Sequence, residues 1–353
     1  MTSKVAIVEF EKGAERESLK RAVELLGGLA DLNTSEKPVV VKVGVFSHKA
    51  ENHTSLPVVD AITNLFNNAS KVMLAESDNY QGKGLERLQL WKELFTERVI
   101  PLDLSDDPEP VKVKLAGQEV NMPSVLLKPK VLVDTHILRS YVNGSILKNL
   151  FGCILDSKRV KYHKVLPTLL ADVYEAIGGV DFAVLDGTLF WLGAGKAPVS
   201  MNTLIVGRDA VAVEAVGASL VGFDPEKMPI IQGFVKRDLG EGTLESIKIV
   251  GASFETLKDK FKSVAAAPRK KSPQRKGPQT WGGQSNQVLN GLIREGFFNQ
   301  SRRTLQDVTT ALEARGLSVK GKERNIADAL ARRVKRNVLK KYKTSEGQVY
   351  WTD

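Results

Sequence analysis

The chain has 353 residues, of which 42% are apolar and 26% charged; this length suits two or three domains, and the composition excludes a wholly disordered protein. Its single cysteine, Cys153, excludes an internal disulfide, a multi-cysteine zinc site and an iron–sulfur cluster held by four cysteines of this chain. The sequence has no apolar run of about 18 residues, and its opening MTSKVAIVEFEKG lacks the pattern of a signal peptide. We therefore expect a cytoplasmic protein with no membrane partner.

The net charge of +10 is unevenly distributed along the chain. Residues 264–353 contain 19 Lys and Arg against 7 Asp and Glu, a net +12, whereas residues 1–263 contain 32 against 34, a net −2. This asymmetry predicts that the C-terminal part meets a polyanion while the larger part has a different role.

In the first half of the chain, Val- and Ile-rich runs alternate with helix-like patterns. The predicted strands are VAIVEF (5–10), PVVVKVGVF (38–46), KVMLA (71–75), VIPLDL (99–104), strands within 111–127, and KVLVDT (130–135). The predicted helices between them are 17–29 and 56–66. This order is typical of an α/β protein in which a mainly parallel sheet has helices on both faces. Residues 111–127 are predicted to form an antiparallel insertion.

The stretch SILKNLFGCI, residues 145–154, predicts a short amphipathic helix. Ser145 is a natural N-cap, which would place the cation Lys148 in the first turn, where the helix dipole disfavours it. A bound phosphate or carboxylate would remove that conflict. Cys153 lies beside the apolar stripe, so we interpret it as a small buried hydrophobic residue rather than a nucleophile.

The second half of the large domain continues the same pattern. Further strands are predicted at DFAVLDG (181–187), TLIVG (203–207) and IKIVG (247–251). Between the last two, residues 209–223 form an Ala- and Gly-rich helix pattern with Asp209 as its N-cap.

After Phe261 the sequence loses its periodicity. We predict an α/β domain at 1–263, a basic Pro- and Gly-rich flexible linker at 264–283, and a small domain at 284–353. The small domain has three helical patterns followed by two short strands around the turn TSEGQ, which resembles a winged-helix (helix-turn-helix) domain.

The third helical pattern and the first wing strand are rich in cations. The candidate nucleic-acid-binding residues are Arg324, Arg332, Arg333, Lys335, Arg336, Lys340, Lys341 and Lys343. Alternatively, this basic face is only solvated, or it docks an acidic protein.

Polar residues gather where the predicted strands end, the usual place for ligands in open α/β sheets. The candidate ligand-binding residues are Lys42, His48, Asn52, His53, Thr54, Glu76, Thr135, Ser145 and Asn149. The candidate catalytic residues are His136, Lys148 and Asp186. We expect His136, Lys148, Asn149 and the loop SHKAENHTS to share one pocket with partly accessible side chains. Whether a metal binds stays open, because no ligand spacing such as HExxH occurs.

Several motifs in order resemble the domain of unknown function 362 family. They are VVVKVGVFSHKAENHTSLPVVDAI (39–62), THILRSYVNGSILKNLFGCI (135–154), KYHK (161–164), VLDGTLFWLGAGKAP (184–198) and GRDAVAVEAVGASLVGFDPEKMPII (207–231). The resemblance covers roughly residues 38–252. It implies that Thr135, His136, Lys148, Asn149, Asp186, Gly187 and Asp209 are family-type positions, and it implies no reaction.

The sequence departs from that family in two ways. Many members carry cysteine runs of the ferredoxin type, whereas this chain has Cys153 alone, so an iron–sulfur cluster is not expected. Glu214 stands where an aspartate is usual.

Three functions stay open at this point. The first is a large domain that binds a small anionic ligand or substrate, with His136 as acid or base and Lys148 holding the anion, joined to a nucleic-acid-binding module. The second is a ligand-sensing transcription regulator. The third is a scaffold whose winged helix docks an acidic protein.

Overall fold

The computed structural model describes residues 2–47, 52–156, 159–193, 197–266, 284–299, 302–335, 338–344 and 347–352. The chain divides between residues 272 and 273 into two compact units, the large unit and the small unit. The predicted linker lies outside the described residues except for 264–266, which end a helix. The predicted domain boundaries stay predictions.

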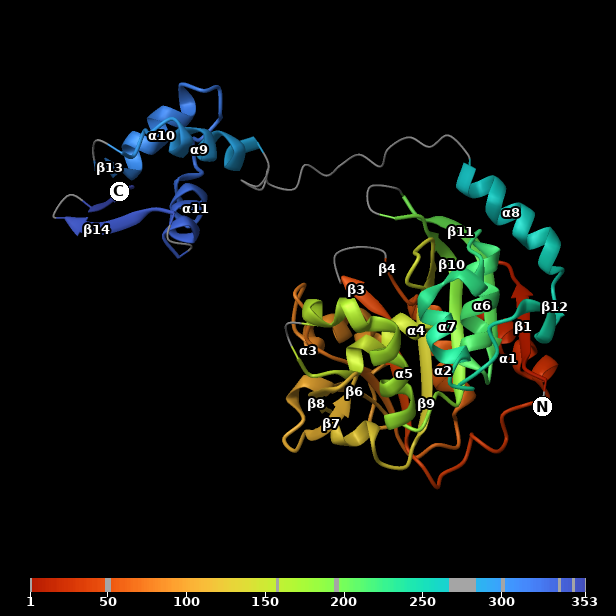
Figure 1. The fold of residues 1–353 in the computed structure, drawn as a ribbon. Helices are drawn as coiled ribbons and strands as arrows, with labels where there is room; N and C mark the ends of the chain where they lie inside the picture. Colours follow the sequence, from red (N-terminus) through yellow and green to blue (C-terminus); the bar gives the residue numbers. More distant parts are fainter. Residues whose placement is uncertain are drawn as a thin grey trace. The chain divides into compact units, whose positions relative to one another are not determined.

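Among the described residues, an eight-stranded sheet forms the centre of the large unit (Figure 1). Across the sheet the strands are β12 (Lys248–Gly251), β1 (Lys4–Glu9), β11 (Val199–Gly207), β10 (Phe182–Trp191), β9 (Val131–Arg139), β2 (Val39–Val43), β5 (Val72–Glu76) and β6 (Val99–Asp103). All of them run parallel except β11, which is antiparallel to both neighbours. The predicted mainly parallel α/β fold is therefore confirmed.

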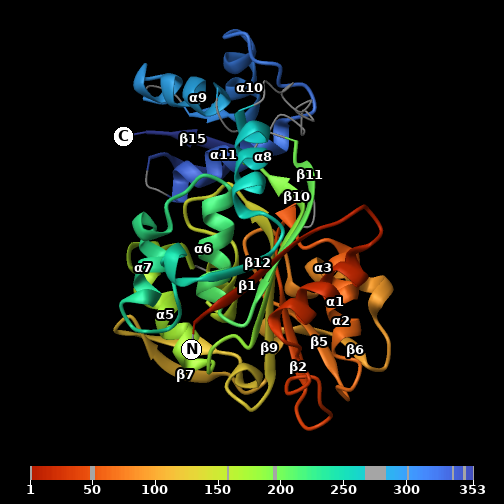
Figure 2. The same cartoon turned by 90° about the vertical axis from the view of Figure 1, so that its right-hand side faces the viewer.

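Helices cover both faces of this sheet, as Figure 2 shows. One face packs against α1 (Glu15–Leu26), α2 (Leu56–Leu65), α3 (Gly84–Leu88) and the 3₁₀ helix η1 (Gln89–Leu94). The other packs against α4 (Ile146–Asn149), η4 (Leu150–Cys153), η5 (Arg159–Val165), α5 (Leu166–Ala176), α6 (Ala210–Leu220), α7 (Pro229–Val235) and α8 (Phe254–Ala266). We call these the α1–α2 face and the α5–α6 face.

Alternation along the strands decides which side chains reach which face. In β2, Val39, Val41 and Val43 belong to the core of the α1–α2 face, whereas Val40 belongs to that of the α5–α6 face. All nine residues of β9 are buried, as expected for a central parallel strand.

Small elements complete the large unit. They are the pairs β3 (Val45–Ser47) with β4 (Asn52–His53) and β7 (Val111–Leu115) with β8 (Gln118–Met122), and the 3₁₀ turns η2 (Leu104–Asp106), η3 (Ser124–Leu126), η6 (Pro225–Lys227) and η7 (Leu244–Ser246). The predicted antiparallel insertion at 111–127 is confirmed by the β7–β8 hairpin.

Two local predictions concern helix ends and packing. The Asp209 carboxylate accepts hydrogen bonds from the backbone N–H groups of Val211 and Ala212, so it caps α6 as predicted. Cys153 is buried in the same core as Ile146 and Leu150, also as predicted. Burial raises the pKa of the Cys153 thiol to about 12, so it is not an activated nucleophile.

The small unit has its own core. Its elements are α9 (Gln284–Arg294), β13 (Arg303–Thr304), α10 (Leu305–Glu313), α11 (Glu323–Lys335), β14 (Lys340–Thr344) and β15 (Gly347–Trp351). The strands form a sheet in the order β13-β15-β14, and Leu292, Leu312, Leu330 and Tyr350 lie in the core between sheet and helices.

Within the described ranges of both units, no helix combines the length and the apolar character that crossing a membrane requires.

Candidate functional site

A buried ammonium group organises the carboxyl end of the sheet. Lys42, on β2, is wholly buried, and its Nζ lies 3.0 Å from Glu76 Oε2 at the end of β5. Nζ also donates to Asn149 Oδ1 at 3.2 Å and to the carbonyl of Val43 at 3.2 Å. Three acceptors around one ammonium compensate its removal from water.

Glu76 is held from a second side by an arginine. Arg87 Nη1 lies 3.4 Å from Glu76 Oε1, and the backbone N–H of Ser77 donates to the same oxygen at 2.8 Å. Burial opposes the charge of Glu76, but Lys42 and Arg87 outweigh it and lower the pKa of the carboxyl. Glu76 is therefore an ionised partner of two buried cations.

The helical stretch predicted from SILKNLFGCI packs its small polar residues onto this ion pair. Asn149 Nδ2 donates to Asp134 Oδ1 at 2.6 Å, while its Oδ1 accepts from Lys42. A Cβ atom on Gly152 would lie 2.9 Å from Lys42 Nζ, so a larger residue there would force the Lys42 ammonium to shift from its present contacts. Asn149 on α4 thus hydrogen-bonds the buried lysine, and Gly152 on η4 packs closely against it.

Asp134 is the least compensated carboxyl of this group. It is wholly buried, and its Oδ2 has no hydrogen-bond partner among the described residues. Burial raises the pKa of Asp134 to about 7, against the hydrogen bond from Asn149 and the charge of Lys42. This carboxyl can therefore gain or lose a proton near neutral pH.

Glu214 occupies the N-terminus of α4, where a bound anion was predicted. Its carboxylate, which comes from α6, accepts the backbone N–H groups of Ser145 and Leu147, each at 2.9 Å. Gly144 has φ +75°, and a Cβ there would lie 2.7 Å from the Glu214 carboxyl carbon. Ser145 is the N-cap residue of α4 as predicted, but its side chain makes no capping bond, and the Glu214 carboxylate accepts the N–H groups instead.

Lys148 projects from the same short helix into cationic surroundings. Its Nζ is buried and has no hydrogen-bond partner in the described part of the chain; it lies over the Phe151 ring, 3.7 Å from the centroid. Burial, together with the charges of Arg139 and Arg159, lowers the pKa of the Lys148 ammonium to about 7. Among the described residues, Lys148 is thus an ammonium group without a carboxylate partner.

The two arginines near Lys148 are already anchored. Arg139 Nη2 donates to the carbonyl of Gly144 at 2.6 Å. Arg159 donates through Nε to the carbonyl of Ile154 at 2.8 Å and through Nη2 to Ser77 Oγ at 2.7 Å. Neither hydrogen-bonds a carboxylate in these contacts, but the charge of Glu214 acts on Arg139 and that of Glu76 on Arg159. Both guanidinium groups still act on Lys148 and help to lower its pKa.

His163 lies at the exposed side of the cations around Lys148. The His163 ring packs against Phe151 with 5.7 Å between ring centroids. Burial and the charge of Lys148 lower the pKa of His163. We call Arg139, Lys148, Phe151, Arg159 and His163 the Lys148 site.

Among the described residues, the structure does not bring His53 of the SHKAENHTS loop to Lys148, and residues 48–51 of this loop lie outside the described residues. The His53 ring packs edge to face on Trp91, 6.0 Å between centroids, and Trp91 belongs to the core of the α1–α2 face. Lys148 belongs to α4 on the opposite face. Asn52 and Thr54 are buried, and His48 lies outside the described residues.

Asp186 is likewise separated from Lys148. It follows Val184 in alternation, which places it on the α1–α2 face, and its Oδ2 accepts the backbone N–H of Ser55 at the start of α2 at 2.7 Å. The structure therefore does not bring Asp186 to Lys148, and the observed contact is a helix cap.

His136 lies inside the protein rather than in an accessible pocket. It is 3% exposed, and its Nδ1 lies 3.2 Å from the carbonyl oxygen of Ile137. Burial, reinforced by Arg139, lowers the pKa of His136 well below its usual value, so the imidazole is neutral at pH 7. The expected accessibility of this side chain is wrong. Thr135 is also buried, with its Oγ1 3.4 Å from Thr54 Oγ1.

In the small unit, most of the predicted basic face is exposed. The exposed members are Arg324, Arg332, Lys335, Lys340 and Lys341. Arg333 is not among them: it is 9% exposed, and its guanidinium donates to Asn290 Oδ1 at 2.6 Å. It ties α11 to α9. Arg336 and the side chain of Lys343 lie outside the described residues.

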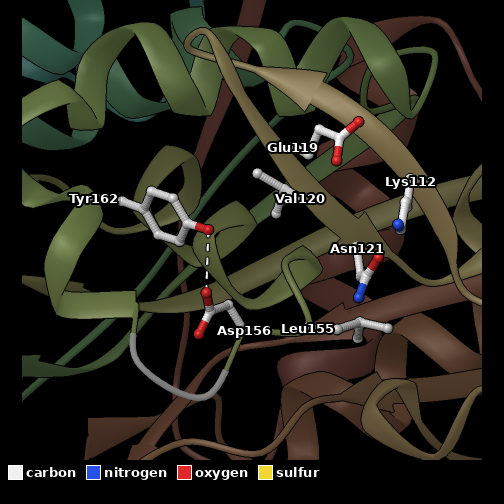
Figure 3. A pocket seen from close by; sticks show the side chains of 7 residues that line it. All are labelled: Lys112, Glu119, Val120, Asn121, Leu155, Asp156 and Tyr162. Carbon is white, nitrogen blue, oxygen red and sulfur yellow. Dashed lines mark hydrogen bonds between the residues drawn. The ribbon is translucent and has the colours of Figure 1, made fainter.

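A separate pocket of about 220 Å³ lies beside the β7–β8 hairpin (Figure 3). Its lining residues are Lys112, Glu119, Val120, Asn121, Leu155, Asp156 and Tyr162. The Tyr162 hydroxyl donates to Asp156 Oδ2 at 3.1 Å. Lys112, Glu119 and Asn121 are exposed, so solvent satisfies them without a ligand. We place the candidate site at Lys148, where a buried charge has no partner.

The described ranges show no candidate metal centre. They contain no group of three or more His, Cys, Asp and Glu side chains arranged to hold an ion.

The sequence motifs did not single out the cations that surround Lys148 and Glu76. Arg139 lies inside the motif 135–154, Arg159 lies between that motif and 161–164, and Arg87 lies in α3. Their signal in the sequence is weak, because arginine in a loop or helix is usually a solvated residue.

Comparison with known proteins identifies a family and a structurally similar protein. The family described as Domain of unknown function (DUF362) matches residues 39–219. A solved structure, the lactate racemase apoprotein from Thermoanaerobacterium thermosaccharolyticum, is similar with a TM-score of 0.39 and 12% identity over 63% of this chain and 57% of that one. The chain thus spans little more than half of that structure, and so weak a similarity carries no inference. No curated protein matches the chain.

The raised pKa of Asp134 predicts how stability depends on pH. Because the folded value is about 7 and the reference value is 3.8, the native state binds more protons than the unfolded state between these pH values. The free energy of unfolding should therefore fall as pH rises from about 4 to 7, by on the order of a few kcal/mol. Asp134→Asn should remove this slope, measured by urea unfolding at several pH values.

The exposed variant Glu245→Gln serves as the control and should keep the wild-type slope. Parallel curves for the wild type and Asp134→Asn would show that Asp134 does not hold a proton in the folded protein.

Proposed function

The chain belongs to the family described as Domain of unknown function (DUF362), and we propose that its large unit binds a small anion at the Lys148 site. The observation that carries this proposal is the Lys148 Nζ, which is buried without a hydrogen-bond partner among the described residues. An ammonium removed from water is costly unless an anion or several acceptors compensate it.

The local charges support an anionic ligand over a cationic or neutral one. Within the described ranges, Lys148 and Arg159 have no carboxylate in their hydrogen bonds, whereas the carboxylate of Glu214 faces the backbone of α4. A phosphate or carboxylate beside Lys148 would interact with two cations and would restore the charged form of the lysine.

Binding is better supported than catalysis. An acid or base must reach the proton it transfers, and His136 is enclosed. Asp186 caps α2 on the other face of the sheet. A catalytic role of His136 with Lys148 needs an opening of this region, and we keep a ligand-binding or ligand-sensing role as the primary proposal.

Anion binding should be coupled to proton uptake. Because the pKa of Lys148 is about 7 without a ligand, an anion that raises it will bind together with a proton at pH 8. Phosphate titrated calorimetrically in two buffers of different ionisation enthalpy should give different observed heats. Affinity should fall as pH rises above about 7, the pKa of the lysine without a ligand.

Lys148→Met should abolish phosphate binding and yet raise the free energy of unfolding by about 1–2 kcal/mol, because an unpaired buried charge is replaced by an apolar group. The matched control is Lys164→Met, which changes an exposed lysine of the same region and should leave both quantities unchanged. Unchanged phosphate binding by Lys148→Met would overturn the proposal.

For the small unit we further propose a winged-helix module that binds nucleic acid. Its order of three helices and three strands, with two strands after the last helix, is the arrangement typical of that class. Five exposed cations on α11 and β14 support the assignment of a polyanionic partner. A partner-docking wing for an acidic protein is the alternative.

Charge reversal tests this second function. Arg332→Glu with Lys335→Glu should weaken binding of a DNA duplex broadly across sequences, and the wild-type affinity should fall steeply with salt. Lys20→Glu with Lys262→Glu makes the same change of charge on the large unit and should have little effect. Fluorescence anisotropy at two salt concentrations measures both, and binding that is insensitive to salt would contradict a phosphate contact.

A further inference from the structure

The small sheet presents an outward face with two aromatic rings. In the β14–β15 register Tyr342 pairs with Val349, and Lys340 pairs with Trp351. Cross-strand partners lie on the same side of a sheet, so Lys340, Tyr342 and Trp351 share one face. Tyr350 alternates with these residues and is buried in the core with the helices. The Tyr342 face therefore points away from the core of the unit.

This face is partly exposed: Val349, the cross-strand partner of Tyr342, is buried, and a guanidinium lies above the two rings. Tyr342 is 59% exposed, and Trp351 is half-buried. The Arg302 guanidinium carbon lies 5.3 Å from the Trp351 ring centroid and 6.0 Å from that of Tyr342. Single exposed apolar side chains are common, so what distinguishes this face is the pair of neighbouring aromatic rings together with the guanidinium above them.

We propose that the surface formed by Arg302, Lys340, Tyr342 and Trp351 binds single-stranded nucleic acid by stacking its bases. This rests on the nucleic-acid function proposed for the small unit and specifies the form of the ligand. Unpaired bases stack on aromatic rings and on guanidinium planes, and each such contact is sequence-tolerant.

Charge and chemistry favour this ligand over the alternatives. Arg302 and Lys340 lie beside the rings, where they can meet phosphates, and residues 264–353 carry a net +12. A duplex hides its base faces, so it can use the cations but not the rings. An acidic peptide would also use the cations, yet it gives no reason for two aromatic rings beside them.

The test compares an oligo-dT single strand of about 12 nucleotides with a duplex of the same length, using the full chain and fluorescence anisotropy. Tyr342→Ala should weaken single-strand binding roughly tenfold or more, while Tyr342→Phe, which keeps the ring, should stay within about twofold of the wild type. Duplex binding should be unchanged in both. Arg302→Lys keeps the charge but loses the planar group, and it should weaken only the single strand.

The outcomes separate this inference from the function on which it rests. Salt-sensitive duplex binding with single-strand binding unaffected by Tyr342→Ala would overturn the inference and leave the nucleic-acid function standing. Binding of neither nucleic acid would overturn both. Tight binding of an acidic peptide that is lost in Tyr342→Ala, without single-strand binding, would assign the surface to a protein partner and also overturn the inference.

Discussion

The ion pair between Lys42 and Glu76 is the interaction around which the carboxyl end of the sheet is built. A lysine on a central strand can stay charged only if acceptors surround it, and here β5, α4 and the strand's own backbone supply them. The requirement fixes the sequence of α4 and η4: Asn149 must bridge Lys42 to Asp134, and Gly152 must leave room for the ammonium. The polar residues of SILKNLFGCI are thus mostly turned toward the interior.

A second constraint is the placement of the acidic residues in the motifs. Asp186, Asp209 and Glu214 each accept backbone N–H groups at or near a helix start, those of α2, α6 and α4 respectively. These residue types suit acid–base chemistry, but helix starts also require acceptors. Once the acids are assigned to caps and Glu76 to its two cations, Lys148 stands out as the charged group near the sheet end that the described residues leave unpaired. The proposed anion binding follows from this unpaired lysine.

The sequence was sufficient for the α/β class of the large unit, because strands buried on both faces appear as continuous Val- and Ile-rich runs and Asp209 is a strong capping residue. It was insufficient for the site. His53 and Lys148 both follow sheet strands, yet alternation and the packing of Trp91 send them to opposite faces, and a single sequence does not show strand order. Arg333 was expected on a binding face because it is basic. Its position around α11 instead turns it toward α9, where it donates to Asn290.

The pKa of Lys148 is the most direct test of the proposed anion site, because it reports both the burial of the ammonium and the binding of an anion beside it. The Lys148 Nζ resonance can be followed by NMR across pH, with Lys148→Arg used for assignment, first without phosphate and then with phosphate in excess. The account predicts a pKa near 7 without phosphate and a higher pKa with it. A pKa near the ordinary value of 10.5 without phosphate, or one that phosphate leaves unchanged, would contradict the proposal that Lys148 is a buried, unpaired ammonium that binds an anion.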